Sequence, residues 1–487
     1  MIDVQKRAVF NEAYAALNTA QKQAVDSIEG PVMVIAGPGT GKTQILTLRI
    51  ANILLNTDTK PENILALTFT ESGASAMRQR LLQYIGSEAY QVGIFTFHAF
   101  AGLLINQYPD AYMRIIGGQI ATDLELLTLI ETIINDGTVK LLRPIGDPRY
   151  YVSALQHMIS SLKQEYITPD GLSGIIAAQE QELLGIERIH QKGAHKGKPR
   201  SEYQKKEKNI AKNRELLYVY RQYEALLHSE RWYDYNDMIL ETIAALEHNE
   251  DMLRDLQELY QYILADEHQD VNGSQNRILE LLTSFHDQPN IFVVGDEKQA
   301  IYRFQGASLE NFLYFEDSFR GTQSISLTTN YRSGQSILDA SFSLIRTDEG
   351  PSAALRIELN AHSKEAAYVH LSSYSHELFE DATIIEQVKT ALAQGTKESQ
   401  IALLLRTNRE VEKYASLLRK EGIAVEATAD TDILMHPITH SIGSLITAVV
   451  EANSEEALTT VLHGPYWHIA SGDLFKVLAA RNHVMPL

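Results

Sequence analysis

The segment Ala36–Thr43 reads AGPGTGKT, and it stands between the apolar run Pro31–Ala36 and a helical pattern that continues as QILTLRIANILL. The apolar run predicts a buried strand, and the spacing of apolar residues after the glycines predicts a helix. The segment has the spacing of a phosphate-binding loop, with Ala36 in the place of the first glycine. It therefore predicts an α/β fold in which backbone N–H groups and a helix N-terminus face an anion.

Other strand-like segments extend this pattern along the chain. Ile64–Thr70, Gly93–Phe97, Tyr262–Asp266 and Ile291–Asp296 are each short and apolar and carry polar residues at their carboxyl ends. In open parallel sheets ligands bind at the carboxyl ends of the strands. We therefore expect the functional site at this edge of one parallel sheet.

The pattern changes twice along the rest of the chain. Between residues 111 and 231 long helical periods replace the strand signals, which predicts a helical insertion. After Asn330 the strand-like IALLLRTN of Ile401–Asn408 and a helical stretch ending at Gly422 predict a second core domain. The expected parts are a first core domain at 1–110 and 232–330, its helical insertion at 111–231, a second and partial core domain at 331–431, and the start of another helical insertion at 432–487.

Composition excludes several classes of protein. The chain has 487 residues and no cysteine, which excludes disulfides and thiolate metal sites. It has no apolar run long enough to span a membrane, so we expect no membrane contact and a cytoplasmic location.

The net charge of -19 opposes nucleic-acid binding except where basic residues gather. One such place is Gln191–Arg214, which contains nine basic residues and only two acidic ones, Glu202 and Glu207. A solvated helix face is an equally good interpretation of this segment.

The loop residues have defined chemistry in a nucleotide site. Lys42 would place a positive charge on the β- and γ-phosphates, and the Thr43 hydroxyl would bind Mg²⁺. The candidate nucleotide-binding residues of the loop are Gly37, Gly39, Thr40, Gly41, Lys42, Thr43 and Gln44.

A second acidic element, YILADEHQD, occupies Tyr262–Asp270. An Asp-Glu pair alone is usually surface charge, but here it ends an apolar strand. In that position Asp266 would bind Mg²⁺, and Glu267 would activate the attacking water.

Together with five further segments, these two motifs form an ordered series from Leu17 to Ser333 that resembles the superfamily 1 DNA helicases of the UvrD/Rep/PcrA type. The further segments are LNTAQ (17–21), LTFTESGASAM (67–77), TFHAF (96–100), VVGDEKQAIYRFQGA (293–307) and NYRS (330–333). The resemblance implies RecA-like core domains, ATP and Mg²⁺ as cofactors, and single-stranded DNA or a single-strand/duplex junction as substrate. It also implies 3′ to 5′ movement in DNA repair, recombination or replication restart.

The resemblance assigns roles to residues outside the P-loop. Gln21 would hydrogen-bond the adenine edge, and Tyr331 would stack on the adenine. Gln299 and Arg332 would contact the γ-phosphate, for which a planar guanidinium is well suited. With these two, the candidate catalytic residues are Lys42, Asp266, Glu267, Gln299 and Arg332.

The same resemblance assigns a second group of residues to single-stranded DNA. Aromatic faces stack on bases without reading sequence, which suits a motor that must accept any strand. For Phe69 taken alone, core packing is the simpler interpretation, and for His98 alone it is a structural role. The candidate DNA-binding residues are Phe69, Thr70, Thr96, His98, Tyr302 and Phe304.

Several positions depart from the family pattern. His268 stands where an aromatic residue is usual, Glu71 and Ser72 where Asn-Lys is frequent, and Gln44 and Gln305 where Arg is frequent. Fewer cations at the strand should weaken phosphate contacts and reduce the salt dependence of DNA binding.

No counterpart of family motifs V and VI is recognised. We therefore expect a chain truncated before the motor is complete, with impaired hydrolysis and unwinding. Three alternatives stay open: the helicase subunit of a helicase-nuclease, a regulatory P-loop ATPase that never touches nucleic acid, and an inactive relative that only binds DNA. Protein partners are not predicted.

Overall fold

The computed structural model describes residues 4–189, 198–299, 310–345, 357–364, 367–427, 437–450 and 455–464, with 467, 469–470, 472–473 and 475–476. Two compact units divide the chain, residues 1–369 and 370–487. The basic residues Lys192 and Lys196 and the predicted DNA-binding residues Tyr302 and Phe304, with Gln305 beside them, lie outside the described residues.

A parallel sheet forms the centre of the first unit. Its strands are β1 (Val32–Ala36), β2 (Ile64–Thr68), β3 (Gly93–Thr96), β6 (Tyr262–Ala265), β7 (Ile291–Gly295) and β8 (Gln323–Leu327), in the order β3-β2-β6-β7-β1-β8. Every pairing in this sheet is parallel; Val32 of β1, for example, lies beside Phe292 of β7 and Gln323 of β8. The strands predicted from sequence are confirmed, with ends that differ by one or two residues.

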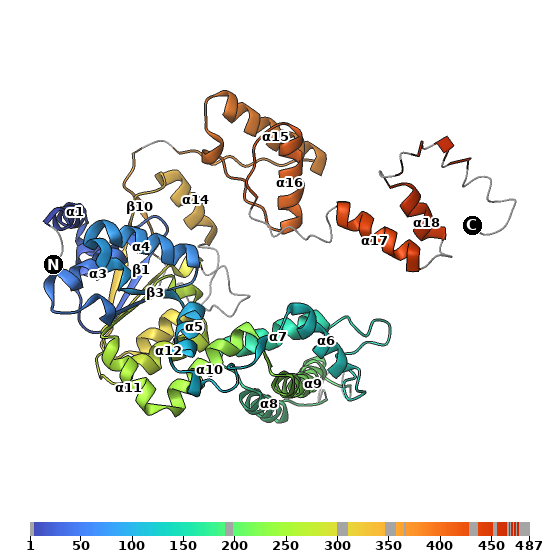
Figure 1. Cartoon of the computed structure of the whole chain (residues 1–487), viewed down its shortest axis with the longest axis horizontal. Coiled ribbons are helices and arrows are strands. Elements are labelled where there is room, and N and C mark those ends of the chain that lie inside the picture. The colour runs from blue at the N-terminus through green and yellow to red at the C-terminus, as the bar shows by residue number, and fades with distance from the viewer. Residues whose placement is uncertain are drawn as a thin grey trace. The chain divides into compact units, whose positions relative to one another are not determined.

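Helices cover both faces of this sheet, because alternate strand residues point to opposite sides. One face, with Val32 and Val34, packs against helices α2 (Thr19–Asp26), α3 (Lys42–Asn56) and α4 (Glu71–Ile85), and α1 (Val4–Ala15) lies over them. The other face, with Met33 and Ile35, packs against α5 (Phe97–Gln107), α10 (Tyr235–His248), α11 (Glu250–Leu259), α12 (Gly273–Thr283) and α13 (Glu310–Ser318) (Figure 1).

A helical subdomain interrupts the sheet between β3 and β6. Its helices are α6 (Asp123–Ile134), α7 (Val152–Gln164), α8 (Pro169–Leu184) and α9 (Ser201–Glu230), and they enclose a hydrophobic core of their own (Figure 1). The parallel pair β4 (Gln119–Ile120) and β5 (Trp232–Tyr233) joins the start and the end of this subdomain.

The first unit continues past the sheet with a short parallel pair, β9 (Thr329–Asn330) and β10 (Asn360–Ala361), and helix α14 (Gln335–Ile345). The second unit contains α15 (Glu377–Ala393), α16 (Asn408–Lys420), α17 (Pro437–Val450) and α18 (Glu455–Leu462). None of the described helices is both long and apolar enough to cross a membrane.

One predicted element is wrong. Ile401–Asn408 is not a strand: residues 401–405 have no regular secondary structure, and Asn408 already begins α16. A strand is stabilised by its hydrogen bonds to a neighbour, and the described part of the second unit contains no strand that could pair with this run. Leu404 is 93% exposed, so the run also lacks the burial that its apolar sequence predicts.

Candidate nucleotide site

The P-loop follows β1 directly and ends where α3 begins at Lys42. Gly39 and Gly41 have φ of 69° and 92°, in the left-handed region that favours glycine. The Thr40 hydroxyl donates to the carbonyl of Gly37 at 2.8 Å, which closes the turn. The loop therefore presents the first turn of a helix to any anion placed above it, as the sequence predicts.

Gln21 fixes the other side of this loop. Its amide nitrogen donates to the Thr40 carbonyl at 2.8 Å, and its amide oxygen accepts from the backbone N–H of Asn18 at 3.0 Å. The side-chain oxygen of Asn18 accepts a hydrogen bond from the backbone N–H of Gln21, so the two residues form a capping box at the start of α2. Gln21 thus lies beside the P-loop, and its contact with an adenine edge stays a prediction.

Close packing explains why Gly37 and Gly39 lack side chains. A Cβ at Gly37 would come within 2.7 Å of Leu359, and one at Gly39 would come within 2.7 Å of both Asn330 and Arg332. Real Cβ atoms do not approach other heavy atoms this closely, so a side chain at either position would displace the neighbouring segment.

Lys42 and Glu267 form an ion pair across the site. The Lys42 ammonium lies 2.7 Å from Glu267 Oε2, and the lysine side chain is only 11% exposed. Glu267 has a φ of 49°, which is uncommon for a residue with a side chain. Backbone of this kind persists only where its surroundings hold it, and it gathers at functional sites.

Several carboxylates gather around Lys42. Burial raises the pKa of Asp266 to about 7, and the adjacent Glu267 carboxylate adds to the rise. Burial also raises the pKa of Asp270 to about 6, and its Oδ1 atom is buried without a hydrogen-bond partner among the described residues. Hard carboxylate and hydroxyl oxygens are the ligands that Mg²⁺ prefers, and the binding of Mg²⁺ by Asp266 and Thr43 stays a prediction.

Gln269 connects this acidic turn to the end of β7. Its amide nitrogen donates to Glu267 Oε2 at 2.8 Å, and its amide oxygen accepts from the backbone N–H of Asp296 at 2.8 Å. The Gln299 amide in turn donates to Asp296 Oδ2 at 2.7 Å. Gln299 is therefore joined to Glu267 by continuous hydrogen bonds. Gln269 and Asp296 were not among the predicted site residues, although both stand inside the quoted motifs.

The NYRS segment packs directly on the P-loop. The backbone N–H of Tyr331 donates to the Gly39 carbonyl at 2.9 Å, and the Asn330 amide donates to the carbonyl of Pro38. Asn330 is fully buried, and its Oδ1 accepts from the backbone N–H of Arg332 at 2.8 Å. Tyr331 is 41% exposed and receives a hydrogen bond from Asn18. The structure thus brings Tyr331 and Arg332 to the nucleotide loop, while Asn330, which sequence reasoning missed, holds them there.

The predicted DNA-binding threonines have a structural role that sequence reasoning missed. Thr70 caps the N-terminus of α4 and Thr96 caps that of α5. The Thr96 hydroxyl also donates a hydrogen bond to Glu71 at 2.8 Å. Glu71, which departs from the family pattern, therefore makes a contact within the protein.

His98 lies in a polar cavity at the carboxyl ends of β2 and β3. The cavity has a volume of about 150 Å³, and Phe69 and Thr96 also line it. His98 packs against Tyr235 at 5.3 Å between ring centroids, and its Nε2 is buried without a hydrogen-bond partner among the described residues. Phe69, Thr96 and His98 therefore lie close together, and their common role in binding a DNA strand stays a prediction.

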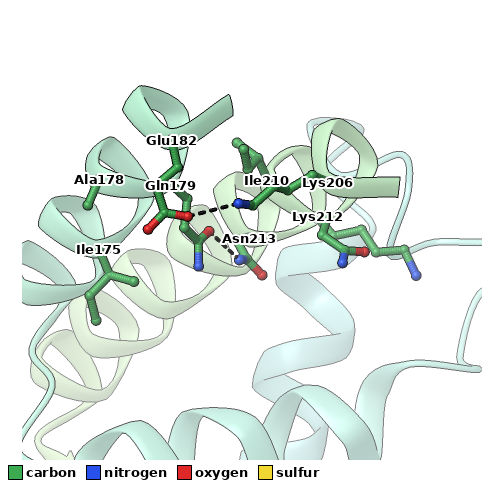
Figure 2. Close-up of a pocket in the computed structure, with 9 residues that line it drawn as sticks. Ile175, Ala178, Gln179, Glu182, Lys206, Ile210, Lys212 and Asn213 are labelled. Atoms are coloured by element: carbon green, nitrogen blue, oxygen red, sulfur yellow. Dashed lines mark hydrogen bonds and ion pairs between the residues drawn. The ribbon is translucent and has the colours of Figure 1, made fainter. Parts of the chain in front are cut away.

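Two of the seven basic residues in the described part of the basic segment pair with carboxylates of α8. Figure 2 shows a groove of about 580 Å³ between α8 and α9, crossed by the Lys206–Glu182 ion pair at 2.9 Å and the Asn213–Gln179 hydrogen bond at 3.0 Å. Arg214 pairs with Glu180 at 2.7 Å. These contacts favour the solvated-face interpretation for this part of α9.

A buried charge network anchors the helical subdomain to α10. Lys163 of α7 is fully buried, and its ammonium lies 2.7 Å from Glu224 and Asp234 and 2.8 Å from Asp237. Arg114 adds contacts to Glu224 at 2.8 Å and to Asp237 at 3.5 Å. Burial lowers the pKa of Lys163, but the three carboxylates together raise it well above 10.5.

Comparison with known proteins agrees with this geometry. The family model described as the UvrD/REP helicase N-terminal domain matches residues 17–320, and the UvrD-like helicase C-terminal domain matches 325–485. The ATP-dependent DNA helicase PcrA of Staphylococcus epidermidis is 26% identical over 477 residues, which cover 98% of this chain and 60% of that protein. PcrA of Staphylococcus aureus is 26% identical over 470 residues, or 96% of this chain and 58% of that protein.

The chain thus spans about 60% of the length of these relatives. The expectation of a chain truncated before the second core domain is complete is not supported, since the C-terminal model matches as far as residue 485.

Proposed function

The chain belongs to the UvrD/REP helicase family, and from this premise we propose that it is an ATP-dependent motor that moves on single-stranded DNA. The observation that carries the proposal is one continuous arrangement: the P-loop, Glu267, Gln269, Asp296 and Gln299 are joined by direct contacts. These contacts link the proposed nucleotide site to Gln299, which directly precedes the segment that is predicted to bind DNA.

The residues of the site divide the reaction among them. Lys42 leaves Glu267 and binds the β- and γ-phosphates, and the P-loop N–H groups bind the remaining oxygens. Glu267, once released, accepts a proton from the attacking water. Mg²⁺ held by Thr43 and Asp266 would offset the phosphate charge. Gln299 and Arg332 contact the γ-phosphate.

The DNA side of the proposal rests on Phe69, Thr96 and His98, which share one cavity. A regulatory ATPase that never touches nucleic acid would not need these three residues to share an open cavity, and an inactive relative would not need the Lys42–Glu267 pair beside the P-loop. Movement from 3′ to 5′, action in repair, recombination or restart, a nuclease partner domain, a cytoplasmic location and slow hydrolysis stay predictions.

The experiment that tests the proposal measures both ligands on the same chain. We expect ATP binding that requires Mg²⁺, oligonucleotide binding that does not depend on sequence, and an ATP affinity that changes when the oligonucleotide is present. Titrations of a fluorescent ATP analogue with and without Mg²⁺ and with and without saturating oligo(dT), anisotropy with labelled oligonucleotides of different sequence, and a steady-state ATPase assay give these quantities. An ATP affinity and turnover that ignore the oligonucleotide would contradict the proposal.

Replacement of Phe69 and of Tyr331 by Ala is expected to have opposite effects on the binding of DNA and of nucleotide. Phe69→Ala should weaken single-strand binding by about 1 to 3 kcal/mol and spare nucleotide binding, because it removes a stacking surface. Tyr331→Ala should do the reverse, weakening ATP-analogue binding by about 1 kcal/mol, since it removes the ring predicted to stack on adenine. Fluorescence anisotropy with labelled oligo(dT) and with labelled nucleotide, run on both variants, checks the assignment. Each variant is the control for the other, so equal losses of both ligands would reject the two roles.

A further inference from the structure

The imidazole ring of His362 lies against the phenol ring of Tyr331. The two ring centroids are 4.8 Å apart, and the ring planes are tilted by 41°. Aromatic rings attract each other at such separations, where offset and tilted arrangements are preferred. Tyr331 is nevertheless 41% exposed, so His362 covers only part of its surface. A further flat group can therefore reach the tyrosine ring from solvent.

Backbone contacts fix the position of His362. The residue directly follows β10, which pairs with β9, and its backbone N–H donates to the carbonyl of Asn330 at 2.7 Å. Leu359, which precedes β10, is 6% exposed and lies close against Gly37 of the P-loop. The short segment that carries His362 is therefore attached both to the NYRS segment and to the P-loop.

Tyr331 is held at two further points. Its backbone N–H donates to the Gly39 carbonyl at 2.9 Å, and its hydroxyl oxygen accepts a hydrogen bond from the side-chain amide of Asn18 at 3.1 Å. Asn18 forms the capping box with Gln21, the residue that is predicted to contact the adenine edge. His362 thus supports one side of a ring whose hydroxyl end is fixed beside Gln21.

A restrained ring binds a flat ligand more tightly than a freely rotating ring does. The ordering of a side chain on binding costs conformational entropy, and a ring that is already held avoids this cost. The contacts with His362 and Asn18 restrain Tyr331 before any nucleotide binds. Adenine is a flat aromatic group, so the partly exposed ring beside the P-loop is arranged in advance for a ligand of this shape.

We propose that His362 is a positioning residue for adenine recognition: its ring holds Tyr331 from one side, and the base stacks on the opposite side. His362 itself does not touch the nucleotide. The inference rests on the proposed function, because it requires that an adenine nucleotide occupy the P-loop. It adds to base recognition a residue that none of the sequence motifs contains.

The first test replaces His362 and measures the affinity for a ribose-labelled fluorescent ATP analogue in the presence of Mg²⁺. His362→Ala should weaken binding by about 2- to 5-fold, a range set by the ordering of one side chain and limited by the loss in Tyr331→Ala. His362→Phe keeps an aromatic ring against Tyr331 and should bind like the parent chain. Inorganic tripolyphosphate has no base, so it should compete with the same inhibition constant in the parent chain and in His362→Ala.

A comparison of single and double variants separates positioning from direct contact. If His362 acts through Tyr331, His362→Ala should have no further effect in a chain that already carries Tyr331→Ala, because residues that act as one unit are not additive. If His362 touched the nucleotide directly, the two losses would add. If it covered the side of Tyr331 that the base needs, His362→Ala would tighten binding. Either of the last two results overturns the inference.

His286→Ala is the matched control, because His286 is another exposed histidine whose ring packs against an aromatic side chain, that of Phe285, at 4.9 Å. It should leave the ATP affinity unchanged. Both histidines are exposed, so both variants should unfold at the temperature of the parent chain. An unchanged ATP affinity in His362→Ala, an equal loss in His286→Ala, or a loss that tripolyphosphate shares overturns the inference alone. A parent chain that does not bind the ATP analogue overturns the proposed function, and this inference with it.

Discussion

Lys42→Ala is expected to weaken ATP binding by about 2 to 5 kcal/mol, the usual cost of removing one partner of a buried, hydrogen-bonded charge pair. Lys42 begins α3 and is the only lysine in the P-loop, so no other ammonium can take its place. The fold should survive, because among the described residues the Lys42 side chain pairs with Glu267, which is 35% exposed and can be hydrated. Calorimetry with ATP and Mg²⁺ measures the loss.

Lys60→Ala is the control for this measurement, since Lys60 is 74% exposed and pairs with Glu62 at 3.7 Å. Its ATP affinity should equal that of the parent chain. If Lys42→Ala binds ATP as tightly as Lys60→Ala, the assignment of the P-loop is wrong.

Lys163→Met should destabilise the junction between the helical subdomain and α10 by about 3 to 5 kcal/mol, because it removes the buried ammonium that pairs with Asp234 and Asp237. Glu224, Asp234 and Asp237 all lie within 2.8 Å of the ammonium that is removed. Hydrogen exchange measured on peptides from α7 and α10 reports the free energy of opening at this junction.

The pH dependence of this variant has a definite sign. Burial already raises the pKa of Asp237 to about 6, although Lys163 acts to lower it. Without Lys163 the carboxylates repel one another more strongly, so the folded-state pKa of Asp237 rises further above its unfolded value of 3.8. A raised carboxyl pKa favours the folded state at low pH, and that stability is lost as the pH rises through the raised value. The variant should therefore be more stable at pH 5 than at pH 8. Lys206→Met, which removes an exposed pair with Glu182, should cost at most about 1 kcal/mol. If Lys163→Met and Lys206→Met lose the same free energy of opening, the buried network stabilises the fold no more than an exposed ion pair does.

Local patterns account for what the sequence predicts of the fold. The P-loop and the strands after it are each encoded within a few neighbouring residues, and the structure has them where expected. The strand order β3-β2-β6-β7-β1-β8 depends instead on contacts between distant segments, which no local pattern records. Ile401–Asn408 shows the limit, because an apolar run is a strand only when another strand pairs with it.

The candidate site divides in the same way. Lys42, Thr43, Asp266 and Glu267 could be singled out because each stands in a short local motif, and the structure brings Lys42 and Glu267 into contact. Lys163 could not, since its partners come from α9 and α10 and each would pass for ordinary surface charge in the sequence. Thr96 is a mixed case: its place in the motif indicates a role at the strand, whereas its cap on α5 becomes visible only with the helix.

The Glu267 carboxylate competes with incoming anions for the ammonium group of Lys42. Glu267 is a tethered carboxylate that lies 2.7 Å from the ammonium, and a tethered group competes at an effective concentration of about a millimolar or more. A lone phosphate or sulfate ion must displace this internal competitor with little else to gain. A nucleoside triphosphate brings several phosphate oxygens for the backbone N–H groups and a Mg²⁺ ion as well, so it displaces the carboxylate where a simple anion does not. Under the proposed function, the same exchange would release Glu267 only when a nucleotide is bound, so its carboxylate would become available to the attacking water only then.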